Sequence, residues 1–253
     1  MTDLDLEERS PSLVERLDGR WYPDVRDNWD DELFRDRILE RMSEDFHVLD
    51  IGAGAGFVAQ MNFKGRCASI VGLDLDPRVV DNPYLDEGRH GGAEEVPWPD
   101  EQFDLVFSDN VLEHLAEPER VFEEVARVLK PGGRFLVKTP NKLHYVPLVA
   151  SLTPHSFHRF FNRLRGRPPE DTFPTRYRAN TPSAVARLAE AAGLVVRSVD
   201  LIESRPEYLR ISAPTYLVGW IWERIVNHVP ALSRFRVLLV AEFEKPMLSG
   251  SGR

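Results

Sequence analysis

Three glycines at alternate positions follow a short apolar run, and this feature constrains the fold more than any other. The run is His47–Ile51, and the glycines are Gly52, Gly54 and Gly56. A mostly apolar five-residue segment of this kind predicts a buried strand of a parallel sheet. Glycines directly after it predict a sharp turn from strand to helix, in which backbone amides can approach a ligand because no Cβ stands in the way.

Strand and helix patterns alternate along the chain, as expected for a parallel sheet covered by helices on both faces. Apolar residues at helical spacing predict helices over 31–42 and 118–129. Thr181 followed by Pro182 predicts a further helix that ends at Gly193. The expected strands cover residues 47–51, 68–73, 103–107, 134–139, 194–202 and 235–243.

Two stretches interrupt this alternation. Residues 140–180 are rich in His, Arg, Phe and Pro without a sustained period, and residues from about 212 to 230 are aromatic-rich and are interpreted as irregular. Loops at the carboxyl ends of strands carry the binding site in open α/β sheets, so we expect both stretches to lie on that side as insertions, the first as a lid. The chain is therefore divided into an N-terminal segment 1–30, a domain 31–245 and a flexible polar tail 246–253.

Charge and cysteine content exclude several classes of protein. The formal net charge of -9 disfavours a nucleic-acid partner, because phosphate binding depends on clustered Lys and Arg. Cys67 is the single cysteine, so no internal disulfide or thiolate metal cluster can form, which agrees with a cytoplasmic location; no metal site is expected. No signal peptide is evident, and the apolar stretch 216–222 is far shorter than the ~20 residues that span a bilayer.

Two acidic residues flank the glycine turn. Asp74 ends the second predicted strand, where a carboxylate can accept hydrogen bonds from both hydroxyls of a ribose. Dinucleotide dehydrogenases share this layout, but their glycines usually run G-x-G-x-x-G, whereas this chain has G-x-G-x-G. Asp50, two residues before the first glycine, would repel a pyrophosphate and attract an ammonium group. The pattern therefore favours an aminoacyl nucleoside as the ligand.

These segments resemble the motifs of class I S-adenosylmethionine-dependent methyltransferases that act mostly on small molecules. The resemblance covers roughly residues 30–140 and keeps the family's order of motifs, which here lie over 48–57, 71–77, 93–104, 108–115 and 127–139. It implies a Rossmann-like, mostly parallel seven-stranded sheet with helices on both faces, an antiparallel last strand and a lid insertion. It also implies S-adenosyl-L-methionine as the cofactor and methyl transfer as the reaction.

The resemblance also assigns cofactor contacts. The methionine part would face Asp50, Gly52, Ala53, Gly54 and Gly56, the ribose would face Asp74, and the adenine would face Leu75, Ala93 and Glu94. Members of the family often carry an acid where this chain has Gly92, so the hydrogen bond to the adenine amine is expected from Glu94 or from the backbone. Asp109 and Asn110 follow a strand at its carboxyl end and are expected to border the methyl donor.

The acceptor half carries fewer signals. His114, His144 and Tyr145 are candidates for a general base or an acceptor contact, although a histidine packed beneath a loop explains His114 at least as well. We predict transfer to an oxygen or nitrogen atom of a small molecule, with a sugar or a lipid-linked precursor as the candidate acceptors, since residues 171–180 resemble methyltransferase-like proteins of polysaccharide and natural-product synthesis. A nicotinamide-dependent oxidoreductase and a non-catalytic S-adenosylmethionine-binding partner protein stay open as alternatives.

Aromatic residues gather in two further places. Trp21, Tyr22 and Trp29 would either close over the cofactor or brace the N-terminal segment. The aromatic residues of 216–222 fit a packing face better than a membrane-touching or substrate surface. Peripheral membrane contact and the oligomeric state are left open by the sequence.

Overall fold

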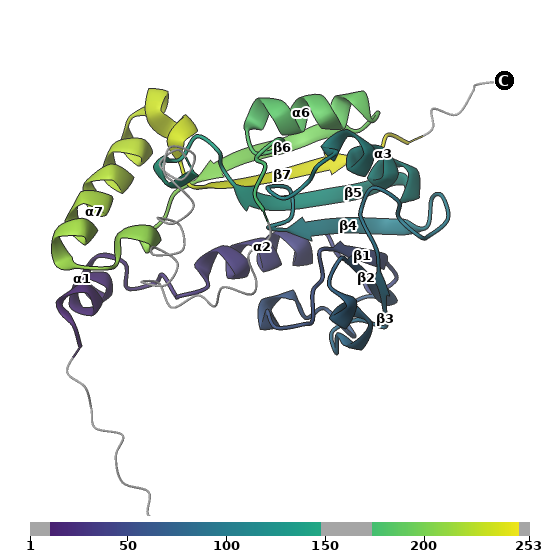
Figure 1. The fold of residues 1–253 in the computed structure, drawn as a ribbon, viewed down its shortest axis with the longest axis horizontal. Helices are drawn as coiled ribbons and strands as arrows, with labels where there is room; N and C mark the ends of the chain where they lie inside the picture. Colours follow the sequence, from purple (N-terminus) through teal and green to yellow (C-terminus); the bar gives the residue numbers. More distant parts are fainter. Residues whose placement is uncertain (1–10, 148–173, 248–253) are drawn as a thin grey trace, which may run out of the picture.

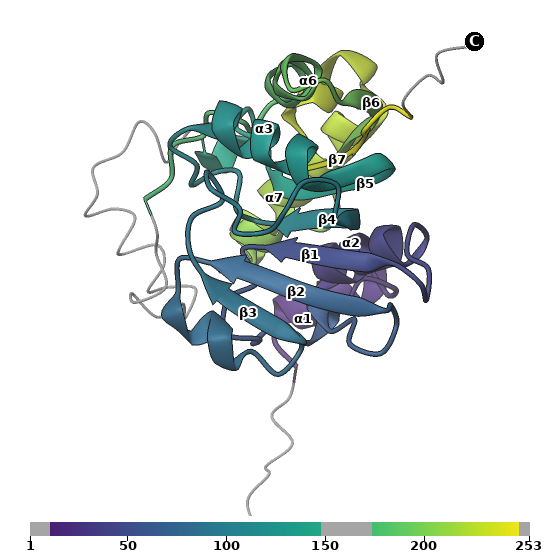
Figure 2. The same cartoon turned by 90° about the vertical axis from the view of Figure 1, so that its right-hand side faces the viewer.

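A seven-stranded mixed sheet forms the centre of the computed structural model, which describes residues 11–147 and 174–247 (Figure 1). The strands are β1 (His47–Ile51), β2 (Ser69–Asp74), β3 (Glu87–His90), β4 (Phe103–Asp109), β5 (Leu129–Pro140), β6 (Val195–Ile202) and β7 (Leu238–Glu244). They lie in the order β3-β2-β1-β4-β5-β7-β6, which can be followed strand by strand in Figure 2. β7 runs antiparallel to both of its neighbours, whereas the pairs among β1 to β5 are parallel. The predicted fold class is confirmed.

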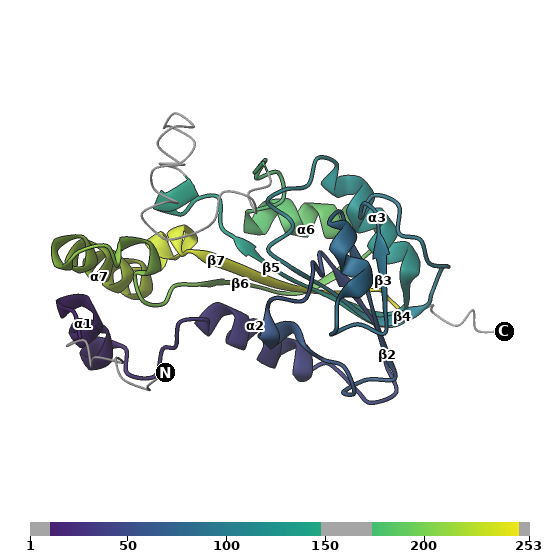
Figure 3. The same ribbon diagram turned by 60° about the horizontal axis from the view of Figure 1, so that its bottom comes forward.

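Helices cover both faces of this sheet. The described α-helices are α1 (Leu13–Trp21), α2 (Trp29–Leu39), α3 (Pro118–Val128), α6 (Pro182–Ala191) and α7 (Ala213–His228). Short 3-10 helices are η1 (Ala59–Met61), η2 (Pro77–Asp81), η4 (Glu207–Leu209) and η5 (Pro230–Phe235). In Figure 3, α3 and α6 lie on one side of the sheet and α2 on the other.

Alternate residues of the central strands serve two separate cores. In β1, Leu49 packs in the core beneath α3 and α6, whereas the preceding Val48 packs in the core beneath α2, with Phe34 and Ile38. Side chains point to opposite faces of a strand in turn, so a strand that is apolar at successive positions must be covered on both sides. The adjacent apolar residues Val48 and Leu49 therefore required two helical layers.

The helix expected after the glycine turn is absent from the described residues. Only η1 follows the turn, because the segment between Gly56 and β2 is short and contains the left-handed Gly65. α2 covers this face instead, and its Phe34 and Ile38 are fully buried. The prediction of a strand-turn-helix unit was therefore wrong in its helix, although β1 is confirmed with both of its predicted ends.

Three further predictions need correction. Residues 131–133, expected to separate α3 from a strand beginning at 134, lie within β5, which begins at Leu129. Phe235 belongs to η5 rather than to β7, and the short polar edge strand β3 was not predicted. Residues 212–230 are not irregular: they contain α7, whose first turn is fixed by a capping box between Ser212 and Thr215. Because α7 is apolar on several sides, its sequence shows no clear helical spacing of apolar and polar residues.

α1 and α7 lie side by side at one end of the molecule (Figures 1 and 3). Trp21 stacks on Tyr216 with ring centroids 5.9 Å apart and meets Trp220 at 4.9 Å. The hydroxyl of Tyr22 donates a hydrogen bond of 2.9 Å to Glu223. Trp21 and Tyr22 therefore brace the N-terminal segment against α7, one of the two interpretations made from the sequence.

None of the described helices is long and apolar enough to cross a bilayer. Residues 148–173 of the predicted lid, with His155 and His158, lie outside the described residues, as does most of the predicted tail.

Candidate active site

A cavity of about 570 Å³ opens where the carboxyl ends of the parallel strands meet, and it has two differently built ends. The glycine end lies over β1 and β4 and is lined by Asp50, residues 52–58, Asn82, Asp109 and Asn110. The tyrosine end lies beyond β5 and β6 and is lined by Tyr145, Glu203, residues 205–208 and residues 27–29. Both ends belong to one continuous space.

The glycine turn has a shape that side chains would prevent. Gly52 has a φ of 86°, and a Cβ at this position would lie 2.1 Å from Val111 Cγ2. The amide of Asn82 donates hydrogen bonds to the carbonyls of Ala53 and Gly54, at 3.0 and 3.1 Å. Asn82 therefore fixes the turn from outside. No local pattern in the sequence marked it, because its partners lie almost thirty residues away.

Asp50 contributes a buried carboxylate to the glycine end. It is 5% exposed, and it forms no hydrogen bond or ion pair with any residue in the described ranges. Burial, together with the nearby charges of Asp109 and Asp74, raises the pKa of Asp50 well above its ordinary value. A cationic group of a ligand would stabilise the charged form of this buried carboxylate. The site therefore fits the ammonium group that the sequence predicted for it.

Asp109 also lines the glycine end, but its charge is already paired. The ammonium of Lys138 is fully buried and lies 3.0 Å from Asp109 and 3.1 Å from Asp30, and it also contacts Asp31. Burial raises the pKa of Asp109 to about 7, although Lys138 opposes this shift. Burial alone would lower the pKa of Lys138, but the three carboxylates together raise it above its ordinary value. This ion cluster ties the start of α2 to β4 and β5.

The predicted ribose and adenine residues do not line the cavity. The carboxylate of Asp74 accepts hydrogen bonds from the backbone amides of Gly54 at 2.8 Å and Asp76 at 2.7 Å. Leu75 is 62% exposed, whereas Ala93 is buried in the core and Glu94 is half-buried. The structure therefore gathers seven of the predicted cofactor residues around the cavity, namely Asp50, Gly52, Ala53, Gly54, Gly56, Asp109 and Asn110.

The three catalytic candidates have different positions. His114 and Tyr145 line the cavity. His144 lies behind Tyr145, with the two ring centroids 4.0 Å apart, and is 1% exposed. Burial lowers the pKa of His144 to about 3, so its imidazole is neutral. His144 supports Tyr145 and does not line the cavity itself.

Glu203 is a site residue that sequence reasoning missed. Its side chain is 5% exposed and lines the tyrosine end, directly after β6. Its carboxylate accepts a hydrogen bond from the backbone amide of Val237 at 2.9 Å and lies 3.6 Å from His144 Nε2. Burial raises the pKa of Glu203 to about 8. An acid directly after the apolar pair Leu201-Ile202 was the signal that could have revealed it.

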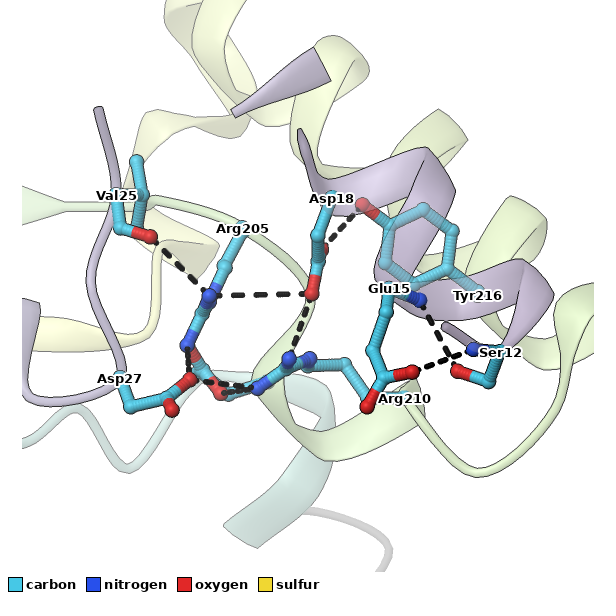
Figure 4. Close-up of polar contacts among 9 residues, drawn as sticks. Ser12, Glu15, Asp18, Val25, Asp27, Arg205, Arg210 and Tyr216 are labelled. Atoms are coloured by element: carbon cyan, nitrogen blue, oxygen red, sulfur yellow. Dashed lines mark hydrogen bonds and ion pairs between the residues drawn. The ribbon is translucent and has the colours of Figure 1, made fainter. Parts of the chain in front are cut away.

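An arginine network builds the outer wall of the tyrosine end (Figure 4). Arg205 is 4% exposed and donates hydrogen bonds to the Val25 carbonyl at 3.2 Å and to Asp27 at 2.7 Å. Arg210 lies 2.6 Å from Asp18, which also accepts a hydrogen bond of 2.6 Å from the hydroxyl of Tyr216. The chain between α1 and α2 is thereby fastened to the residues around η4.

Comparison with known proteins identifies the central part of the chain. Residues 49–137 match the family model described as a methyltransferase domain. A probable S-adenosylmethionine-dependent methyltransferase of Mycolicibacterium smegmatis is 38% identical over 105 residues, which is 40% of each chain. An uncharacterized methyltransferase of Bacillus subtilis is 35% identical over 127 residues, 47% of each chain. The chain contains a class I S-adenosylmethionine-dependent methyltransferase domain.

Solved structures agree with this methyltransferase fold. The YcgJ protein from Bacillus subtilis superposes with a TM-score of 0.53 at 21% identity, covering 85% of this chain and 98% of the other. The geranyl diphosphate C-methyltransferase from Streptomyces coelicolor, in complex with S-adenosyl-L-homocysteine, gives a TM-score of 0.55 at 14% identity, covering 85% and 78%. The domain match and the curated relatives, rather than these structures, assign S-adenosylmethionine as the cofactor of the methyltransferase domain. The sequence match spans 40% and 47% of the lengths of the two curated relatives.

Proposed function

We propose that this methyltransferase domain transfers a methyl group to an oxygen or nitrogen atom of a small-molecule acceptor held at the tyrosine end. The observation that carries the proposal is that, among residues 11–147 and 174–247, the residues of the glycine end and of the tyrosine end line one and the same cavity. Methyl transfer is an in-line displacement that mainly requires donor and acceptor to be held close together. One shared cavity provides that proximity.

The glycine end supplies the groups that would hold S-adenosylmethionine, which when bound provides a methyl group on a sulfonium. Asp50 would pair with its ammonium group, and the amides of residues 52–56 would approach its carboxylate. Asp74 would accept the ribose hydroxyls, with Leu75, Ala93 and Glu94 beside the adenine. Asp74 is presently engaged with the Gly54 amide, so ribose binding at Asp74 requires a small movement of the glycine turn.

The tyrosine end supplies the groups that would meet the acceptor. Tyr145 and Tyr208 offer aromatic faces and hydroxyls, which suit the faces and hydroxyls of a sugar. Glu203 and His114 are the candidate bases, and the Glu203 carboxyl, with a pKa of about 8, would act as a base once it has lost its proton near that pH. Relatives of this chain include a ubiquinone biosynthesis O-methyltransferase and a sarcosine/dimethylglycine N-methyltransferase. We extend the proposal to a sugar or a lipid-linked precursor as the acceptor, used in the cytoplasm.

Calorimetry followed by an acceptor panel tests this function. We expect the full chain to bind S-adenosylmethionine and S-adenosylhomocysteine but not NAD, and to transfer radiolabelled methyl groups to a hydroxylated or amino acceptor. The Tyr145→Phe and Glu203→Gln variants should keep cofactor affinity and lose turnover. NAD binding without S-adenosylmethionine binding would overturn the proposal. Cofactor binding without turnover on any acceptor would favour a non-catalytic partner protein instead.

A further inference from the structure

The two sides of α7 differ sharply in what they contact. Its aromatic residues face inward: Tyr216 is fully buried against Trp21, and the rings of Trp222 and Tyr145 lie 5.4 Å apart. Its aliphatic residues face outward and are between 40% and 62% exposed, namely Leu217, Val218, Ile221 and Ile225. These positions repeat at helical spacing and form one stripe along the helix, which we call the aliphatic stripe.

The exposed ionisable side chains of α7 and of η5, which follows it, are all basic. The exposed positions of α7 include the basic Arg224 and His228, and its only acidic residue, Glu223, is buried and paired with Arg224 at 3.2 Å. η5, which follows the helix, exposes Arg234. Residues 211–236 contain three arginines and one acid in a chain whose net charge is -9. A basic margin beside an apolar stripe is complementary to an anionic lipid surface.

A second copy of the chain fits this surface less well. A helix of 16 residues is about 24 Å long, so a stripe roughly 10 Å wide offers about 240 Å², well below the ~800 Å² that each partner buries in a standard interface. A lipid surface does not impose this area requirement, because single side chains can insert between headgroups.

We propose that α7 docks the protein on an anionic lipid surface, with the aliphatic stripe inserted among the headgroups and Arg224, His228 and Arg234 at the phosphate level. The same helix borders the active-site cavity, since Gly219 packs so closely on Pro206 that a Cβ there would lie 2.5 Å from the Pro206 side chain. Pro206 lines the tyrosine end. Docking through α7 therefore places the tyrosine end on the inner side of the docked helix, independently of which acceptor binds there.

Vesicle sedimentation with the full chain tests the docking without any need for turnover. We expect the protein to bind vesicles that contain phosphatidylglycerol more tightly than vesicles of phosphatidylcholine alone, with affinity that falls as salt rises. Val218→Glu and Ile221→Glu should each lower the partition coefficient roughly tenfold, because each places a charge among the headgroups. Arg234→Glu should lower it at least about fivefold on the anionic vesicles only.

Val80→Glu is the matched control, because Val80 is 57% exposed on η2, away from α7. It should change vesicle binding less than about twofold, and thermal unfolding should show that all variants fold, as expected for exposed positions. If an α7 glutamate variant fails to fold, Ile221→Ser replaces it. Absence of binding to anionic vesicles at low salt would overturn the proposal, as would equal binding by Val218→Glu. A dimer that Ile221→Glu dissociates would assign the stripe to a second copy instead.

Discussion

The two ends of the cavity are built by different means. The glycine end is mostly one run of chain, residues 50–58, and its shape depends on backbone torsions. The tyrosine end is assembled from side chains far apart in the sequence: Arg205 bonds Asp27 across 178 residues, and Tyr216 bonds Asp18 across 198. The glycine end leaves the Asp50 charge unpaired, whereas the tyrosine end pairs its outer acids with arginines. A site can thus combine a locally encoded half with a half that exists only in the folded chain.

The largest expected effect concerns the pH dependence of stability at the tyrosine end. Burial raises the pKa of Glu203 from 4.5 to about 8, so the folded chain keeps a proton that the unfolded chain releases between these values. Since the unfolded state then binds fewer protons, the free energy of unfolding falls as pH rises through this window, by on the order of 5 kcal/mol. Glu203→Gln should remove this decline in urea unfolding measured from about pH 5 to about pH 9.

Glu244→Gln is the control with the opposite sign. Its hydrogen bonds with Arg197 lower the pKa of Glu244, so this carboxylate contributes stability above its unfolded pKa, and the contribution is lost as pH falls. The stability of the Glu203 variant relative to the native chain should therefore rise between about pH 5 and about pH 9. The Glu244 variant should show a constant deficit over that range and approach the native chain only as pH falls below 4.5. Parallel pH profiles for the native chain and Glu203→Gln would show that Glu203 is not buried as described.

The arginine network should dominate the stability of the tyrosine end. Arg205→Met removes a cation that is 4% exposed and leaves the buried Asp18 and the part-buried Glu207 without it, which should cost about 3 kcal/mol of unfolding free energy. Arg197→Met is the matched control, because Arg197 pairs with Glu244 at 2.8 Å but its side chain is 49% exposed, and it should cost less than about 1 kcal/mol. Equal losses in urea unfolding would mean that Arg205 does not fasten this wall.

Asp50→Asn should separate cofactor affinity from stability at the glycine end. The variant removes an unpaired buried charge, so the free protein should unfold at a higher temperature, while the Kd for S-adenosylmethionine rises about 100-fold. Asp104→Asn serves as the control, since Asp104 pairs with Lys130 at 2.7 Å and does not line the cavity. Thermal unfolding would measure the expected rise in unfolding temperature, and calorimetry on the same samples would measure the expected rise in Kd. An unchanged Kd would place the cofactor's ammonium elsewhere.

Asn82→Ala should give the smallest effect of the series. Loss of its two hydrogen bonds to the glycine turn should raise the Kd for S-adenosylmethionine about tenfold with a modest loss of stability. Asn62→Ala is the comparison, because Asn62 is exposed and its side chain bonds only the nearby Lys64 amide at 3.2 Å. If both variants bind equally well, the turn keeps its shape without support from Asn82.

Much of the fold followed from local patterns. β1 was predicted with both of its ends, and the capping signal of Thr181 and Pro182 located α6, because caps and apolar periods act over a few residues. α7 was missed although Ser212 and Pro214 mark its start, since aromatic residues on its inner side and aliphatic residues on its outer side obscured the period. The helix after the glycine turn was predicted by analogy with other nucleoside folds, and the short connection to β2 did not accommodate it.

The sequence by itself predicted the cofactor, since the resemblance rests on the glycine turn, Asp50 and Asp74, which a short stretch of chain can specify. It also predicted β1, β2 and β4, whose carboxyl ends lie at one edge of the sheet. Only the tertiary structure decided that Lys138 would be buried among three carboxylates, that Glu203 would face the cavity and that Arg205 would hold the N-terminal segment. Burial and long-range pairing depend on which distant segments pack together, and no local pattern encodes that choice.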